Sequence, residues 1–201
     1  MLIIEGVVGV GKTSLMNYLV KEGFTAFSEP VLDNPILDKF YRNRQRYAFA
    51  AQIYFLSKRF ENLQIASHVS NPIMDRSIYG DGIFADMHKE TKTMEEVEYE
   101  IYHELHQIIL KNIEIPTLLV YLQVSVDVAI NRIQKRGVDY EQNVERSYWE
   151  KLNEKYETYF SNYTLSPILT INVDHLDFEA SVDDRVYIIM RIKEALEALK
   201  S

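Results

Sequence analysis

Five short apolar runs alternate with long stretches of helical periodicity, and no other feature of this sequence restricts the fold as strongly. The runs are rich in Ile, Val, Leu, Phe and Thr, as buried strands are, and they cover residues 2–5, 24–28, 72–75, 117–123 and 168–173. The helical stretches cover residues 11–22, 44–69, 95–112, 126–136, 146–162 and 181–199. Strands that alternate with helices and are apolar throughout favour a parallel sheet covered on both faces. We therefore predict an α/β fold with a five-stranded parallel sheet, and a single domain over residues 1–201 because no linker or internal repeat interrupts it.

Composition and charge exclude several classes of function. The chain of 201 residues is 47% apolar, enough for a substantial core, and its 22 basic against 30 acidic residues give a net charge of -8. We therefore expect no nucleic acid or membrane as a partner, and any polyanion bound must be small and held locally. The absence of Cys excludes disulfides, thiolate metal sites and Cys nucleophiles. No apolar run is long enough to cross a membrane and the first residues do not resemble a signal peptide, so a cytoplasmic protein is expected.

Residues 6–13 read GVVGVGKT, which matches the phosphate-binding pattern G-x-x-x-x-G-K-[ST]. The pattern follows a predicted strand and opens a predicted helix, the context that such a loop requires. Gly6, Gly9 and Gly11 allow successive backbone N–H groups to approach phosphate oxygens at a helix N-terminus. Lys12 adds positive charge near the terminal phosphates, and the Thr13 hydroxyl can ligate Mg²⁺. The loop predicts a nucleoside triphosphate site but leaves the reaction open, because switches, motors, ATPases and small-molecule kinases all share it.

Two carboxylates follow predicted strands at the same edge of the sheet. Asp75 ends the third apolar run, where a protein with this loop places its second magnesium contact. The alternative is that Asp75 or Ser77 caps the next helix. Glu29 follows the second run and precedes Pro30, whose fixed φ stiffens the turn, so Glu29 is a candidate general base for an alcohol acceptor. On the turn alone, a solvated Glu29 is the simpler interpretation.

Several motifs together resemble a known family. They are Glu29-Pro30, the RYAFAAQ segment of residues 46–52 with Arg59 beyond it, Asp75-Arg76-Ser77 followed by Asp81, and Arg132 with Arg136-Gly137 ahead of Glu141. In this order, and together with the phosphate-binding loop, they resemble the deoxynucleoside kinases over essentially the whole chain. The similarity is greatest to bacterial deoxyadenosine and deoxycytidine kinases. The resemblance implies the P-loop kinase fold with a short arginine-bearing lid.

The resemblance also implies roles for residues that would hold the nucleoside. Glu29 is similar to the base that accepts the proton of the sugar 5′-hydroxyl, and Arg76 to the arginine that holds this hydroxyl and the transferring phosphoryl group. Gln52 matches the amide that makes a two-point hydrogen bond to the nucleobase. Tyr41 and Glu141 match the pair that contacts the 3′-hydroxyl. Packing is an alternative role for Tyr41 in a chain with 14 Tyr.

Arg59 and Asp81 match positions that accompany recognition of bases with amino groups in the resembled family. A desolvated Arg–Asp pair has fixed geometry and presents donors and acceptors that a base must satisfy. A base that leaves such groups unpaired can be rejected by about 10⁴-fold. The alternative is a surface ion pair worth about 0 to 1 kcal/mol.

Arg132 and Arg136 resemble the arginines of the family's lid, which hold the triphosphate of the donor. They lie four residues apart and share a helix face, although cations near a helix C-terminus can also serve only to complement the helix dipole. Relatives often carry a further Arg directly after the glycine, where this chain has Val138. The lid therefore lacks one expected cation.

The sequence as a whole predicts an enzyme that transfers the γ-phosphoryl group of ATP, with Mg²⁺ on Thr13 and Asp75, to the 5′-hydroxyl of deoxyadenosine or deoxycytidine in nucleotide salvage. The resemblance further implies a homodimer formed through helices. One alternative is a kinase of nucleoside monophosphates, which shares the loop and the lid. A nucleotide-dependent switch with little turnover is another, but a switch has no need of Glu29, Gln52, Arg59 or Asp81.

Overall fold

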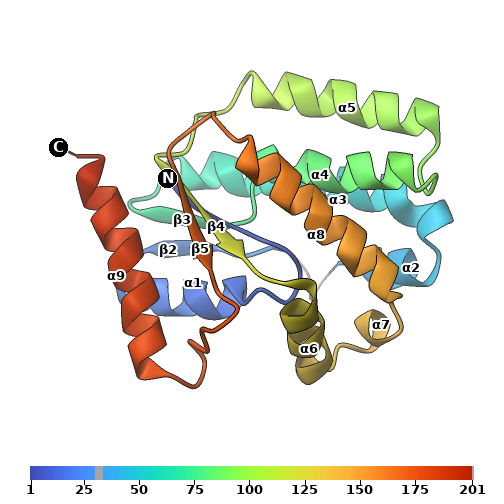
Figure 1. The fold of residues 1–201 in the computed structure, drawn as a ribbon. Helices are drawn as coiled ribbons and strands as arrows, with labels where there is room; N and C mark the ends of the chain where they lie inside the picture. The colour runs from blue at the N-terminus through green and yellow to red at the C-terminus, as the bar shows by residue number, and fades with distance from the viewer. Residues whose placement is uncertain (30–33, 201) are drawn as a thin grey trace.

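The computed structural model describes residues 1–29 and 34–200, and within them five strands form one parallel sheet (Figure 1). The strands are β1 (Leu2–Glu5), β2 (Thr25–Phe27), β3 (Pro72–Asp75), β4 (Leu118–Gln123) and β5 (Ile168–Asn172). Their order across the sheet is β2-β3-β1-β4-β5, and every neighbouring pair is parallel. The predicted fold class is thereby confirmed, and each strand lies within the run that predicted it.

Helices cover both faces of this sheet. They are α1 (Lys12–Lys21), α2 (Leu37–Arg42), α3 (Arg44–Ala66), α4 (Ile78–Glu90), α5 (Glu96–Leu110), α6 (Val126–Arg136), α7 (Asp139–Gln142), α8 (Arg146–Ser161) and α9 (Val182–Ala198). Figure 1 shows α1 and α9 on one side and α3, α4 and α8 on the other, with α5 as an outer layer against α3 and α4. The predicted helices are present with ends that differ by at most three residues. The sequence interpretation gave no bounds for α2, α4 and α7.

The core lies between the sheet and these helices, and its centre is β1 with its neighbour β4. Leu2, Ile3 and Ile4 are all fully buried, as are Leu119 and Val120. A strand buried on both faces has no polar alternation, which is why these runs are continuously apolar. None of the helices in residues 1–29 and 34–200 combines the length and apolarity that crossing a membrane requires.

The strand order decides which loops meet. Because β3 lies between β2 and β1, the segments that follow these three strands emerge side by side at the carboxyl edge of the sheet. They bring the phosphate-binding loop, Glu29 and the Asp75-Arg76 pair together. Pro30, which the sequence interpretation used to stiffen the turn, lies outside the described residues.

Candidate active site

The loop of residues 6–13 wraps around the N-terminus of α1. Gly6, Gly9 and Gly11 have φ values of 148°, 82° and 101°, in the region that favours glycine. At Gly9 the close approach is decisive, because a Cβ there would lie 2.6 Å from the Ala129 carbonyl oxygen. Lys12 is buried, and its Nζ donates hydrogen bonds of 2.9 and 3.1 Å to the carbonyls of Gly6 and Val7. Burial lowers the pKa of Lys12 to about 8.

A cavity of about 1480 Å³ brings nearly all of the predicted site residues together. Those that line it are Gly9, Gly11, Lys12, Thr13, Glu29, Tyr41, Gln52, Arg59, Asp75, Arg76, Asp81, Arg132, Arg136 and Glu141. Gly6 does not line the cavity, because it begins the loop and turns its carbonyl to Lys12. Residues from six helices and from the ends of β2 and β3 therefore face one space, although they are spread over positions 9 to 141 of the sequence.

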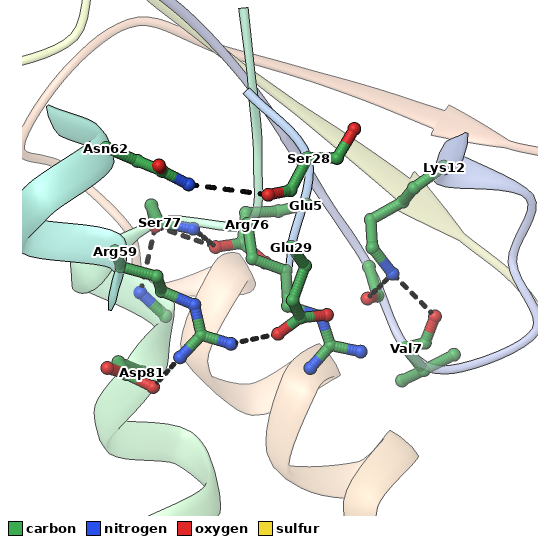
Figure 2. Close-up of polar contacts among 12 residues, drawn as sticks. Glu5, Val7, Lys12, Ser28, Glu29, Arg59, Asn62, Arg76, Ser77 and Asp81 are labelled. Carbon is green, nitrogen blue, oxygen red and sulfur yellow. Dashed lines mark hydrogen bonds and ion pairs between the residues drawn. The ribbon is translucent and has the colours of Figure 1, made fainter. Parts of the chain in front are cut away.

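Arg59 on α3 lies between two carboxylates, as Figure 2 shows. Its guanidinium donates to Asp81 Oδ1 on α4 and to Glu29 Oε1 after β2. Arg76 approaches the other oxygen of Glu29, with Nε 3.3 Å from Oε2. The side chains of Arg59 and Asp81 are 4% and 0% exposed, so this pair is an interior one and not the surface alternative.

These charges alter one another's protonation. Burial by itself raises the pKa of Glu29, but the nearby Arg76 and Arg59 guanidinium groups outweigh it and hold this pKa below its ordinary value. Burial dominates at Asp81 and raises its pKa in spite of Arg59. Glu29 is consequently ionised at neutral pH and can accept a proton. A further contact positions it, since the Ser28 carbonyl accepts a bond of 3.4 Å from Asn62 on α3 (Figure 2).

Asp75 and Thr13 provide oxygen atoms suited to a hard cation. Asp75 is buried, and its Oδ1 has no hydrogen-bond partner among the described residues. The exposed Thr13 side chain lines the same cavity. A carboxylate and a hydroxyl are ligands that Mg²⁺ accepts, so these residues fit the metal that the sequence predicts. Ser77, and not Asp75, caps α4: its hydroxyl accepts a 3.0 Å bond from the Gly80 N–H.

Two further unpaired hydrogen-bond acceptors belong to residues that line the cavity. Gln52 Oε1 and Asp81 Oδ2 are buried and, within the described part of the chain, have no hydrogen-bond partner. Tyr41 stacks on Tyr140 with ring centroids 5.2 Å apart, so packing accounts for part of its role. Buried Glu141 pairs with the lid residue Arg136.

Comparison with known proteins identifies the family of the chain that forms this cavity. The sequence model for deoxynucleoside kinases matches residues 2–197. The chain belongs to the deoxynucleoside kinase family. It is 39% identical to a deoxyguanosine kinase of Lactobacillus johnsonii, covering 98% of this chain and 93% of that protein. It is 38% identical to a deoxyadenosine/deoxycytidine kinase of Bacillus subtilis, covering 87% and 82%.

A solved structure agrees with the sequence relatives. The deoxyadenosine kinase from M. mycoides with bound dATP superimposes with a TM-score of 0.85 at 30% identity, covering 96% of this chain and 98% of that one. The predicted family, the P-loop kinase fold and the enzyme class are thereby confirmed: the protein is a kinase that phosphorylates deoxynucleosides with a nucleotide donor. The roles of individual residues remain predictions.

The kinase's lid is formed by the end of α6 and by α7. Gly137 ends α6 in the left-handed region with φ 73°, and Val138, at the position where the resemblance implies a further arginine, lines the cavity. Arg132 makes bonds of 3.1, 2.8 and 2.9 Å to the backbone carbonyls of Val10, Val173 and Leu176. Its guanidinium thus joins the phosphate-binding loop to the segment after β5. If Arg132 also contacts a phosphate group, it does so in addition to these hydrogen bonds or in exchange for some of them.

Sequence reasoning missed a buried charged residue beside the kinase's site. Glu5 is 1% exposed, ends β1 and accepts bonds from Ser77. The rule that drew attention to Asp75, a carboxylate at the carboxyl end of a buried strand, applies equally to Glu5. The aromatic side chains of Phe55, Phe84 and Tyr148 also line the cavity without having been predicted there.

Proposed function

We propose that this kinase transfers the γ-phosphoryl group of ATP to the 5′-hydroxyl of a deoxyribonucleoside, with deoxyadenosine and deoxycytidine as preferred acceptors, in nucleotide salvage. One observation carries the proposal: a single cavity is lined by the phosphate-binding loop, by the ionised carboxylate of Glu29 and by the buried polar side chains of Gln52 and Asp81. The loop suits a triphosphate, whereas the other groups suit an uncharged nucleoside.

Charge and position supply the catalysis. Glu29 accepts the proton of the 5′-hydroxyl, whose oxygen then forms a bond to the γ-phosphorus while the bond between this phosphorus and the β,γ-bridging oxygen breaks. Arg76, beside Glu29, stabilises the negative charge on the phosphoryl oxygens together with Lys12. Arg136 lies in the lid and is half-exposed, so it can turn from Glu141 toward the phosphates.

Thr13 and Asp75 would hold Mg²⁺ beside the phosphates. The metal supplies charge neutralisation between neighbouring phosphate groups. The buried Asp75 oxygen without a partner in the described residues supports this assignment, since a buried acceptor left unpaired is costly.

The unpaired acceptors favour bases with an amino group at C6 of a purine or C4 of a pyrimidine. Gln52 Oε1 and Asp81 Oδ2 can each accept from an N–H donor. Adenine and cytosine carry an amino group next to a ring nitrogen that accepts, whereas guanine and thymine carry an oxo group in the corresponding position. An oxo group there would leave both acceptors unsatisfied, and this supports deoxyadenosine and deoxycytidine. The names of the relatives divide between deoxyguanosine and deoxyadenosine/deoxycytidine kinases.

An acceptor panel tests this function directly. The purified enzyme is given ATP, Mg²⁺ and, separately, each of the four deoxynucleosides and deoxyadenosine monophosphate. We expect the largest kcat/KM with deoxyadenosine or deoxycytidine. A preference for deoxyguanosine would overturn the reading of Gln52 and Asp81, and turnover only of the monophosphate would favour the nucleoside monophosphate kinase. Tight ATP binding without turnover of any acceptor would favour the switch.

We also propose a homodimer in which α5 meets its copy. The outer face of α5 exposes Val97, Ile101, Leu105 and Ile108, which are between 39% and 56% accessible and fall at helical spacing. A continuous exposed apolar stripe supports an interface, and a symmetric dimer would bury the same stripe twice.

The cytoplasmic location expected from the sequence stays a prediction, which cell fractionation tests.

A further inference from the structure

The buried carboxylate of Glu5 holds the turn that carries Arg76. Glu5 Oε1 accepts two hydrogen bonds of 2.7 Å, one from the backbone N–H and one from the hydroxyl of Ser77 (Figure 2). The Arg76 N–H in turn donates a 3.0 Å bond to the carbonyl of Ile4, the residue before Glu5. The end of β1 is therefore bonded to two successive residues after β3.

This turn has a conformation that arginine seldom adopts. Arg76 has φ 65°, in the left-handed region, which costs a residue with a side chain of order 1 kcal/mol. Such a residue persists only when its surroundings hold it. The two bonds from Ser77 to Glu5 fix the peptide that follows Arg76, and the bond to Ile4 fixes the one that precedes it.

The conformation matters because of where it places the Arg76 guanidinium. Its Nε lies 3.3 Å from Glu29 Oε2, and its Cζ lies 5.0 Å from the centroid of the Phe84 ring. An ordinary right-handed or extended backbone at Arg76 would direct the side chain elsewhere. The contact with the proposed base therefore depends on the turn.

Glu5 is suited to this task as a carboxylate. It is fully buried, and burial raises its pKa, whereas the hydrogen bond from Ser77 and the nearby charges of Arg76 and Lys12 favour the carboxylate. Its second oxygen, Oε2, has no hydrogen-bond partner in the described segments. The carboxylate also packs closely against α4, because a Cβ at Gly80 would lie 2.7 Å from Glu5 Oε1. The NH₂ group of an amide at this position would face either the nearby cations or the two Ser77 donors, and neither can accept a hydrogen bond from it.

We propose that Glu5 is a positioning residue for phosphoryl transfer, which acts by holding Arg76 in the conformation that places its guanidinium against Glu29. Glu5 touches neither the donor nor the acceptor in this role. The inference rests on the proposed function, in which Glu29 is the base and Arg76 stabilises the transferring group.

The test combines Glu5→Gln with Arg76→Lys in a double-mutant cycle. For Glu5→Gln alone we expect kcat with deoxyadenosine to fall about 10- to 100-fold while KM for ATP is retained, because a misplaced Arg76 affects the transfer and not donor binding. In the Arg76→Lys background, Glu5→Gln should lower kcat by less than about twofold, because the guanidinium that Glu5 positions against Glu29 is already absent. A merely structural carboxylate would give the same loss in both backgrounds.

Glu157→Gln is the matched control. This carboxylate on α8 accepts partly buried bonds of 2.8 and 2.6 Å from Tyr121 and Gln123, and its amide variant has only one oxygen left to accept them. We expect a lower melting temperature and an unchanged kcat. An unchanged kcat in Glu5→Gln, or equal losses in both Arg76 backgrounds, would overturn the proposal.

Ser77→Ala provides the same test if Glu5→Gln does not fold. It removes one of the two bonds to Glu5 and also the cap of α4, so we expect a lower melting temperature in both backgrounds and a smaller loss of kcat, again only where Arg76 is present. A Ser77→Ala loss that persists with Arg76→Lys would contradict the proposal. Failure of the function itself is distinguishable, because the wild-type enzyme would then not phosphorylate any deoxynucleoside.

Discussion

Single side chains in the cavity depend on one another through charge. Arg59 forms ion pairs with both Glu29 and Asp81, and Glu29 forms ion pairs with both Arg59 and Arg76. Removing one member of a buried pair typically costs about 3 to 5 kcal/mol, because the partner is left buried and uncompensated. To avoid this loss of stability, a substitution in the cavity should preserve the shape of the side chain or remove both members of an ion pair.

Glu29→Gln separates proton transfer from binding, since it keeps the shape of the side chain and removes its basicity. We expect kcat to fall by at least about 10²-fold, the scale of general-base catalysis, with ATP affinity nearly unchanged. Steady-state kinetics with deoxyadenosine and a direct ATP-binding titration measure the two quantities. A variant that turns over like the wild type would remove the base assignment.

Joint replacement of Arg59 and Asp81 tests base selection. With both residues apolar, for example Arg59→Met and Asp81→Ala, no charge of this pair is left alone, and the demand for an amino group on the base is relaxed. We expect thymidine to gain in kcat/KM relative to deoxyadenosine and deoxycytidine. The single variant Arg59→Met serves as a comparison and should be less stable, because Asp81 is left buried without Arg59 and Glu29 keeps Arg76 alone of its two arginine partners. An unchanged ranking of the four acceptors would contradict the role of this pair.

At the scale of elements, both ends of α4 are held by specific side chains. Ser77 caps its N-terminus, and His88 near its C-terminus organises the turn to α5. His88 is 1% exposed, its Nδ1 lies 2.7 Å from Thr93 Oγ1, and its ring meets Phe40 edge-on at 5.2 Å. The Nε2 atom has no partner within the described residues. A charged imidazole here would be buried without a counterion.

His88 should accordingly make stability depend on pH. Burial, assisted by Arg44, lowers the pKa of His88 to about 4. In the unfolded chain this pKa is about 6.5, so between these values the unfolded state binds more protons and stability falls as the pH falls. The full effect is about 3 kcal/mol, from 1.36 kcal/mol per pKa unit.

Urea unfolding at several pH values between 4 and 6.5 measures this dependence. We expect the His88→Asn variant to lose much of the slope that the wild type shows in this range, whereas His103→Asn, at an exposed position on α5, should retain it. Equal slopes for the wild type and His88→Asn would show that other groups cause the effect.

At the scale of the whole molecule, α5 lies outermost and turns apolar residues to the solvent (Figure 1). The helix packs against α3 and α4 through Tyr102 and His106, so its inner face is occupied and only its outer stripe is open. A second copy that covers this stripe would also cover the layer behind the residues of α3 and α4 that we propose contact the base.

Ile101→Glu tests the dimer. A charge in the middle of this exposed apolar stripe should shift the mass measured by sedimentation or light scattering from two chains to one. His103→Glu, which adds the same charge on another side of α5, should leave the mass unchanged. If the wild-type enzyme is a single chain at micromolar concentrations, the homodimer is wrong.

The sequence by itself determined the local features of this protein. Strand runs, most helices and the phosphate-binding loop follow from short-range patterns, because apolar periodicity and glycine spacing act over neighbouring residues. The helices without predicted bounds, α2, α4 and α7, have weak local signals: two are short, and α4 contains Gly80 and Gly82.

Only the tertiary structure decided which of these features meet. That Arg59 reaches both Glu29 and Asp81, that Arg132 binds carbonyls of two distant segments, and that Glu5 holds the Arg76 turn depend on the order of strands and the packing of helices. Contacts between residues far apart in the chain depend on the energy of the whole packed interior, which no local pattern records. The same carboxylate can be solvated in a turn or buried between two arginines, and its surroundings in the fold decide between them.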